Sequence, residues 1–169
     1  MSGAGAPSLA VDGRGMRVAI IAGSWHTEVM GGLVAGASES VAAAGAEHVV
    51  FTVAGAFELP AAAQAALTPA EQGGGGFDVA VCLGVIIRGG TPHFEYVSNA
   101  VTDGLTRVQL DTGRPVGFGV LTTDNEQQAL DRSGLAGSVE SKGQEAAEAA
   151  LHLAVQLRLI RASAQNGGA

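Results

Sequence analysis

The segment RGGTPHFEYV, residues 88–97, combines side chains that suit chemistry on a phosphorylated ligand. Its two adjacent glycines let the backbone approach a ligand closely, and their amides, with those of a helix N-terminus, form an anion site. Thr91 is a favourable N-cap and Pro92 suits a first helical turn, so a helix is predicted to begin here. His93 then lies beside the positive end of the helix dipole, which disfavours imidazolium, whereas a bound phosphate favours it. The segment predicts a phosphate site with a proton-transferring histidine; a histidine that merely caps or solvates its loop is the alternative.

Four further side chains extend this candidate site, two of them near predicted strand ends. Trp25, the only tryptophan, follows the first apolar run. It either occupies the core or, at the carboxyl end of a strand, stacks on a flat heterocycle. Glu58 opens a predicted helix, where a carboxylate is favourable even without a function. Arg132 and Lys142 flank the loop SGLAGSVES, and two of only nine lysines and arginines near one loop favour anion binding over ordinary surface positions.

Charge and motif content exclude several other classes of function. The net charge is −7 and lysine and arginine form no cluster, which argues against nucleic acid as a partner. No dinucleotide fingerprint follows a strand, and no Walker A, GxSxG, HExxH or CxxC motif occurs, so we expect no cofactor and no metal. His26, His48 and His152 are too scattered to suggest a metal site and are predicted to be structural or exposed.

The chain is expected to be cytoplasmic. Its N-terminal residues lack the basic and apolar regions of a signal peptide, and its apolar runs are too short to cross a bilayer, so no membrane association is expected. Cys82 is the only cysteine and lies within an apolar run, which predicts a buried thiol in a reducing compartment.

Apolar periodicity and glycine punctuation predict alternating strands and helices. The predicted strands are 17–23, 48–55, 78–87 and 115–123, and the predicted helices are 27–44, 58–67, 92–112, 125–134 and 142–161. Strands apolar on both faces indicate an α/β fold, a four-stranded parallel sheet covered by helices on both sides, with its site at the carboxyl ends of the strands. Residues 1–15 are predicted to form a flexible arm and residues 16–169 a single domain. Only 15% of residues are charged, which favours a large subunit interface.

Five segments carry a family resemblance, in the order GSWH, GAFELP, LGVIIRGGTPHFEYV, FGVLTTDNEQQALDRSG and SKG. From Arg17 to the last helix, the chain resembles the lumazine synthases (6,7-dimethyl-8-ribityllumazine synthases) of riboflavin biosynthesis. The resemblance implies a flavodoxin-like three-layer sandwich. It also implies a transferase that condenses 5-amino-6-(D-ribitylamino)uracil with 3,4-dihydroxy-2-butanone 4-phosphate without a cofactor. A non-catalytic flavin or pterin binder and a shell-forming protein on the same scaffold are the alternatives.

The resemblance assigns one group of residues to the ribityl-substituted pyrimidine. Trp25 would stack on the pyrimidine ring, replacing the phenylalanine common in the family. Glu58 would accept hydrogen bonds from the ribityl hydroxyls, and Phe118 would come from the neighbouring subunit. The rest of the ribityl contact and the pyrimidine pocket would be formed by Ala56, Phe57, Val85, Ile86 and Ile87.

A second group is assigned to the phosphorylated substrate. Gly90 and Thr91 would cradle the phosphate; position 90 is often a larger or acidic residue in the family, so Gly90 offers only its backbone. Arg132, from the neighbouring subunit, and Lys142 would bind the phosphate. His93 would be the catalytic proton-transfer residue.

The resemblance also implies an oligomer. The family forms pentamers, and some members assemble pentamers into a shell of sixty chains. The seven residues LAGSVES between Gly134 and Lys142 resemble the longer links of members that stop at the pentamer, although Gly137 keeps the other geometry accessible. We therefore expect a free pentamer, with riboflavin synthase as a candidate protein partner.

Overall fold

The computed structural model describes residues 11–166 and contains one four-stranded, all-parallel sheet. Its strands are β1 (Arg17–Gly23), β2 (Glu47–Val53), β3 (Val79–Ile87) and β4 (Val116–Thr123). They lie in the order β2-β1-β3-β4, with parallel pairing throughout. This is the flavodoxin-like order, in which the chain reverses its direction of travel across the sheet between β1 and β3. The predicted parallel α/β fold is confirmed.

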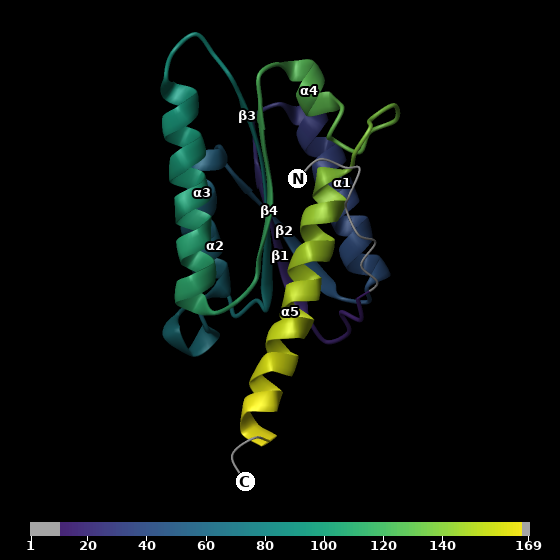
Figure 1. Cartoon of the computed structure of the whole chain (residues 1–169), viewed down its shortest axis with the longest axis vertical. Helices are drawn as coiled ribbons and strands as arrows, with labels where there is room; N and C mark the ends of the chain where they lie inside the picture. Colours follow the sequence, from purple (N-terminus) through teal and green to yellow (C-terminus); the bar gives the residue numbers. More distant parts are fainter. Residues whose placement is uncertain (1–10, 167–169) are drawn as a thin grey trace.

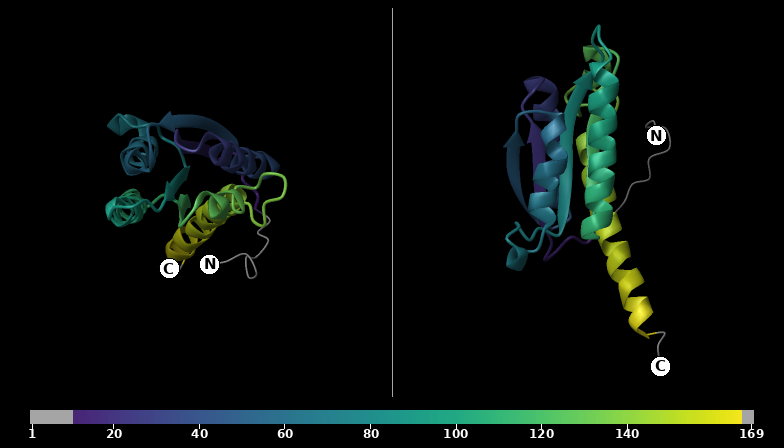
Figure 2. Two further views of the ribbon diagram at one scale, coloured as in Figure 1. Left: turned by 90° about the horizontal axis from the view of Figure 1, so that it is seen from above. Right: turned by 90° about the vertical axis from the view of Figure 1, so that its left-hand side faces the viewer.

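Helices cover both faces of the sheet, which gives three layers (Figures 1 and 2). The helices are α1 (Thr27–Ala43), α2 (Leu59–Leu67), α3 (His93–Thr112), α4 (Glu126–Leu130) and α5 (Lys142–Asn166), with short 3-10 helices η2 (Ala56–Glu58) and η3 (Ala70–Gln72). Figure 1 shows α2 and α3 on one side of the sheet and α1 and α5 on the other. The C-terminal part of α5 extends beyond the end of the sheet (Figure 2, right).

The alternating direction of the side chains along β1 explains why the protein has two hydrophobic cores, one on each face of the sheet. Val18 and Ile20 pack into the cluster shared with α1 and α5, while Ala19 and Ile21 pack into the cluster shared with α2 and α3. Successive strand residues point to opposite faces, so a strand covered on both sides must be apolar at every position. The central strands β1 and β3 meet this requirement and are almost completely buried.

The edge strand β2 departs from the expectation that every strand is covered on both faces. Val49, Val50 and Phe51 are 45%, 43% and 41% exposed. At this edge the single chain provides no further strand and only partial helix cover, so apolar side chains of β2 face solvent. Val49 and Phe51 point to one face of the sheet and Val50 to the other, so β2 exposes apolar side chains on both faces.

A glycine sets the closeness of α5 to α1. A Cβ on Gly143 would lie 2.0 Å from the carbonyl oxygen of Leu33, so only glycine permits this approach of the two backbones. Because Lys142 precedes Gly143, the same contact fixes where Lys142 enters the fold.

Several predicted boundaries were wrong, among them the end of α5, which extends to Asn166 rather than residue 161. Thr91 is not the N-cap of α3: the cap is Pro92, no side chain caps the helix, and His93 is its first residue. The helix α4 ends at Leu130 rather than residue 134, because the chain turns through Gly134 at φ 81°. The link between the last two helices is therefore 131–141, longer than the seven residues inferred from the sequence.

The predicted arm lies only partly within the described region. Residues 1–10 lie outside it. Residues 11–15 contact the domain, since the Gly13 N–H donates a hydrogen bond to the Ala44 carbonyl oxygen (2.7 Å). Within residues 11–166, none of the helices combines the length and the apolar content needed to cross a membrane.

Candidate active site

A cleft of about 460 Å³ opens at the carboxyl ends of β1, β2 and β3. This is the edge at which parallel sheets place their ligands, beside the reversal of strand order between β1 and β3. The cleft is lined by Trp25, His26, Ala54, Gly55, Ala56, Phe57, Glu58, Val85, Ile86, Ile87, His93 and Val97. Eight of the residues predicted from the sequence therefore share one cavity, although they come from four separate segments of the chain.

The aromatic ring and the carboxylate of the cleft meet at Gly55. The Gly55 N–H donates to Glu58 Oε2 (2.8 Å), so the Glu58 carboxylate caps the N-terminus of η2. A Cβ on Gly55 would lie 3.3 Å from Cδ1 of Trp25, so the indole packs closely against this backbone. Trp25 is nevertheless 69% exposed, which excludes the core position considered from the sequence and leaves its ring available to a ligand.

The floor of the cleft is apolar and rigid. Val85 and Ile86 are buried near the C-terminal end of β3, and Ile87, its last residue, is half-buried. Each lies within the ladder that pairs β3 with β4. A flat ring that enters beside Trp25 therefore meets a surface whose backbone is already hydrogen-bonded to the sheet.

The predicted phosphate loop runs from the end of β3 to α3. Gly89, Gly90 and Thr91 are all exposed, and a Cβ on either glycine would meet no atom within 4 Å. Gly90 and Thr91 do not line the cleft but lead directly to His93, which does. As the first residue of α3, His93 lies at the positive end of the helix dipole, where amides of the first turn have no partners within the helix.

The other three predicted residues lie elsewhere in the chain. Phe118, Arg132 and Lys142 line a second hollow of about 550 Å³ between β4 and α5, and this hollow shares no residue with the cleft. Phe118 is exposed, and the Arg132 guanidinium donates to the carbonyl oxygen of Gln128 (2.9 Å). One chain thus carries the predicted site in two separate parts.

Lys142 is held by two carboxylates in this second hollow. Its Nζ lies 2.9 Å from Glu140 Oε2 and 2.7 Å from Glu145 Oε2. Burial acts to lower the pKa of Lys142, but the hydrogen bonds and charges of Glu145 and Glu140 outweigh it and raise the pKa above 10.5. Lys142 is therefore a fixed positive charge, partly neutralised by its neighbours.

Four residues that line the cleft were not among the predicted site residues: His26, Ala54, Gly55 and Val97. His26 was predicted to be structural or exposed, but it is half-buried and lines the cleft. Its backbone is left-handed (φ 56°, ψ 61°), a conformation that is uncommon for residues other than glycine. The sequence signal was its position directly after Trp25, at the turn from β1 into α1.

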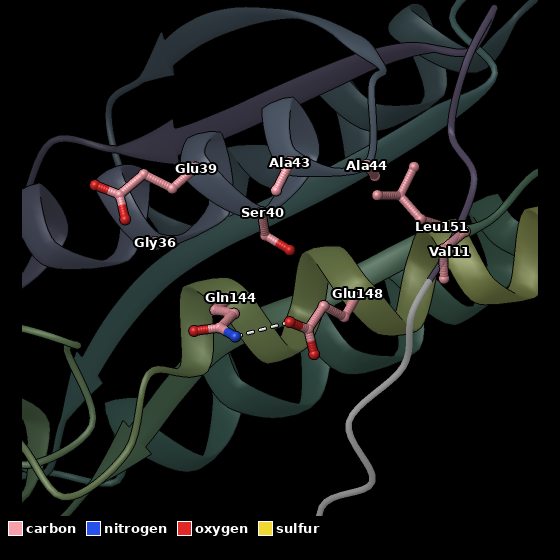
Figure 3. Close-up of a pocket in the computed structure, with 9 residues that line it drawn as sticks. All are labelled: Val11, Gly36, Glu39, Ser40, Ala43, Ala44, Gln144, Glu148 and Leu151. Atoms are coloured by element: carbon pink, nitrogen blue, oxygen red, sulfur yellow. Dashed lines mark hydrogen bonds between the residues drawn. The ribbon is translucent and has the colours of Figure 1, made fainter.

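A further hollow of about 380 Å³ lies between α1 and α5 and contains none of the predicted site residues (Figure 3). Gln144 and Glu148 face it from α5 and are joined by a 2.7 Å hydrogen bond, and Glu39 and Ser40 face it from α1. It lies between two helices, away from the strand ends, and does not add to the candidate site.

Comparison with known proteins agrees with this fold. The family model described as 6,7-dimethyl-8-ribityllumazine synthase matches residues 15–158. A protein of that name from Leifsonia xyli is 61% identical over 163 residues, covering 95% of this chain and 99% of its own. Proteins of the same name from Clavibacter michiganensis (56% identical, 95% and 99% covered) and Kineococcus radiotolerans (55% identical, 94% and 95% covered) are similar along nearly their whole length. The chain belongs to the 6,7-dimethyl-8-ribityllumazine synthase family.

Proposed function

We propose that this protein condenses 5-amino-6-(D-ribitylamino)uracil with 3,4-dihydroxy-2-butanone 4-phosphate. The products are 6,7-dimethyl-8-ribityllumazine, phosphate and water, the penultimate step of riboflavin biosynthesis. The observation that carries this proposal is the single cleft that joins an exposed indole, a carboxylate and a histidine at the strand ends. Membership of the family, along most of the chain, supports it.

The pyrimidine occupies the end of the cleft formed by Trp25 and β3. Its ring stacks on the exposed indole, and backbone groups of Val85–Ile87 contact its edge. The ribityl chain runs along residues 56–58, where Glu58 accepts from its hydroxyls. One Glu58 oxygen already accepts from the Gly55 N–H at 2.8 Å, which orients the carboxylate before the substrate arrives.

The phosphorylated substrate occupies the end formed by the glycine loop. The amides of Gly90 and Thr91, with the N-terminus of α3, bind the phosphate because this helix end carries partial positive charge. Arg132 and Lys142 complete the phosphate site from a neighbouring subunit. His93 lies between loop and cleft and transfers protons as phosphate leaves.

The reaction needs alignment and proton transfer. The diamine attacks the ketone and forms an imine with loss of one water; phosphate is then eliminated, and the resulting enol tautomerises. Ring closure releases a second water. Holding both substrates together contributes through proximity, for which effective molarities can reach about 10⁵ M or more. A positioned histidine adds roughly 10²–10⁴-fold at the proton-transfer steps.

A cleft and a separate hollow that together make one site require a second subunit. Phe118, Arg132 and Lys142 reach the cleft of the neighbouring chain if subunits contact one another head to tail, an arrangement that closes into a ring. The exposed apolar side chains of β2 suit such a contact, and residues 1–15 contribute to it. We propose a pentamer rather than a shell of sixty chains, because the link 131–141 between α4 and α5 is long.

Light scattering tests the assembly. A mass near five chains of 16.8 kDa is expected. A mass near sixty chains would contradict the pentamer, and a fully active monomer would contradict the shared site. We further propose that the enzyme acts in the cytoplasm and that riboflavin synthase, which consumes its product, is a candidate partner; co-purification of the two from the native cell tests that association.

The decisive experiment mixes both substrates with the protein and follows lumazine formation by absorbance. The wild-type protein is expected to form product at a rate proportional to enzyme concentration. His93→Ala is expected to lower kcat by about 10²–10⁴-fold because the proton-transfer group is lost. His152→Ala, a histidine on α5 outside the cleft, serves as the matched control and is expected to keep full activity.

Two results would contradict this proposal. Absence of product with the wild-type protein would favour a flavin or pterin binder on the same scaffold. Unchanged turnover in His93→Ala would remove His93 from the mechanism while leaving the activity intact.

A further inference from the structure

Arg88 joins three elements at the edge of the cleft. It follows the last residue of β3, and its N–H donates to the carbonyl oxygen of Thr123 at the end of β4 (2.9 Å). Its side chain reaches in two directions. Nε donates to Asp124 Oδ1 (2.9 Å), in the turn before α4, and Nη1 donates to Glu95 Oε1, in the first turn of α3.

The guanidinium also lies over an aromatic ring. Its Cζ is 4.2 Å from the ring centroid of Phe94, the second residue of α3. Phe94 is half-buried and packs against the core cluster between the sheet and α3. Arg88 is therefore fixed by an ion pair on each side and by a ring beneath it, a combination that its planar, forked head can satisfy and an ammonium cannot.

The segment that Arg88 spans has little else to hold it. Gly89 and Gly90 touch no packed neighbour on the side where a Cβ would project, and residues 89–93 are all exposed. No side chain caps the start of α3. Glycines have the largest conformational freedom of any residue, so a loop of this kind needs an external constraint to present its amides in one geometry.

Asp124 is itself held by a hydrogen bond, so its ion pair connects Arg88 to the rest of the fold. The Asp124 N–H donates to Gln128 Oε1 (3.0 Å), and the neighbouring Asn125 caps α4 through a hydrogen bond from the Gln128 N–H (2.9 Å). Through these contacts, Arg88 connects Glu95 and Phe94 on α3 to the ends of β3 and β4 and to the start of α4.

We propose that Arg88 is a positioning residue, which holds the first turn of α3 and the glycine loop against the carboxyl ends of β3 and β4 and so places His93 for proton transfer. The proposal rests on the proposed role of His93. Arg88 acts through the loop and the helix rather than on the substrates: it does not line the cleft, and its Nε and Nη1 each donate to a carboxylate.

The expected effect follows from this arrangement. A misplacement of about 1 Å can slow a reaction by roughly 10²-fold. Loss of the Arg88 side chain leaves the bond from its N–H to Thr123 intact, so the displacement is partial and a reduction of kcat by about 10-fold is expected. The Michaelis constant for the butanone phosphate is expected to rise, because the loop amides bind its phosphate. Binding of the pyrimidine at Trp25 is expected to stay within about twofold, because that end of the cleft is built from β1, η2 and β3.

The test compares Arg88→Gln with Arg88→Lys in the full-length protein. The readouts are kcat, the Michaelis constant of each substrate, and pyrimidine affinity from Trp25 fluorescence. Arg88→Lys is expected to recover part of kcat, since an ammonium can keep one of the two ion pairs. The matched control is Arg107→Gln, which removes an exposed arginine on α3 whose Nε lies 3.1 Å from Asp111 Oδ2, away from the cleft.

A double-mutant cycle separates positioning from a general structural role. Asp124→Asn is expected to lower kcat in the wild-type background and to have no further effect in Arg88→Gln. If Arg88→Gln fails to fold, Asp124→Asn and Glu95→Gln each remove one arm of the network while Arg88 remains, and each is expected to lower kcat.

Several outcomes would overturn the proposal. Arg88→Gln with the kinetics of Arg107→Gln would show that the network has no influence on the reaction. Unchanged kcat with only a raised Michaelis constant for the butanone phosphate would make Arg88 a phosphate ligand, and additive effects in the cycle would mean that it acts independently of Asp124. His93→Ala separates these results from a failure of the proposed function: if that variant is fully active, the site assignment itself is wrong.

Discussion

Gly143→Ala tests how closely α5 packs on α1 and, with it, the position of Lys142. The added Cβ would lie 2.0 Å from the carbonyl oxygen of Leu33, 2.7 Å from its carbonyl carbon and 2.8 Å from its Cα. All three are backbone atoms inside α1, so no side-chain rotation can relieve the contact. Ordinary contact begins at 3.4 Å, which leaves a shortfall of about 1.4 Å that only a movement of α5 or α1 can supply.

The magnitude follows from overpacking. Forcing an extra methyl group into a well-packed contact costs about 1–3 kcal/mol, and this contact lies at the severe end because backbone must move. Alanine recovers at most about 1 kcal/mol of helix propensity over glycine. We therefore expect the free energy of unfolding to fall by about 2 kcal/mol, which for a chain of this size lowers Tm by roughly 4–8 °C.

Thermal unfolding measured at one protein concentration checks this value, because the Tm of an oligomer depends on concentration. Gly31→Ala is the matched control: Gly31 lies on the exposed side of α1 and an added Cβ meets no atom within 4 Å. That variant is expected to be stabilised by about 0.5–1 kcal/mol through reduced backbone entropy of the unfolded chain. If Gly143→Ala unfolds at the wild-type temperature or above, the close approach of α5 to Leu33 is wrong.

Three further predictions concern the site. Arg132→Ala is expected to raise the Michaelis constant for the butanone phosphate by about one to two decades, since a charge-assisted contact is worth roughly 1.5–3 kcal/mol. A change in the Michaelis constant of the pyrimidine alone would contradict a phosphate role. Trp25 fluorescence is expected to be quenched by the ribityl-substituted uracil, and an unchanged signal at saturation would contradict stacking. Because the pKa of Lys142 is raised above 10.5, its ion pairs with Glu140 and Glu145 contribute fully below that pH, and this contribution is lost as pH rises through the folded value. The wild-type protein is therefore expected to lose stability above pH 10.5 more steeply than Lys142→Met, and parallel alkaline unfolding curves would refute the role of these ion pairs.

The sheet was predictable because its strands are short apolar runs that end at glycines or turns. Continuous apolar runs such as RVAIIAG and VAVCLGVII lack the pattern of an amphipathic helix. Because a helical segment separates each strand from the next, only a few sheet topologies are possible. The strand ends could then be collected as one site, since parallel strands end at the same edge. This reasoning failed at β2, because apolar content alone does not tell an edge strand from a covered one.

Local boundaries were less predictable. Thr91 has the chemistry of an N-cap, but Pro92 adopts the capping position at φ −68° and ψ 6°, and the helix begins one residue later. The segment after Leu130 has helical composition, yet Gly134 turns there with a positive φ and leaves α4 short. In both cases, the residue at which the helix begins or ends depends on tertiary contacts, which the local sequence does not reveal.

By itself, the sequence determined the α/β class; it predicted a site at the strand ends and, through motif resemblance, the residues that would form it. The tertiary structure alone decided that Trp25 is exposed rather than buried, that His26 enters the cleft, and that Phe118, Arg132 and Lys142 lie in a separate hollow. It also brought Arg88 to Asp124 across 36 positions of the chain. The physical reason is the same for each: periodicity records which face of an element is apolar, whereas the meeting of side chains from different elements depends on how the layers pack.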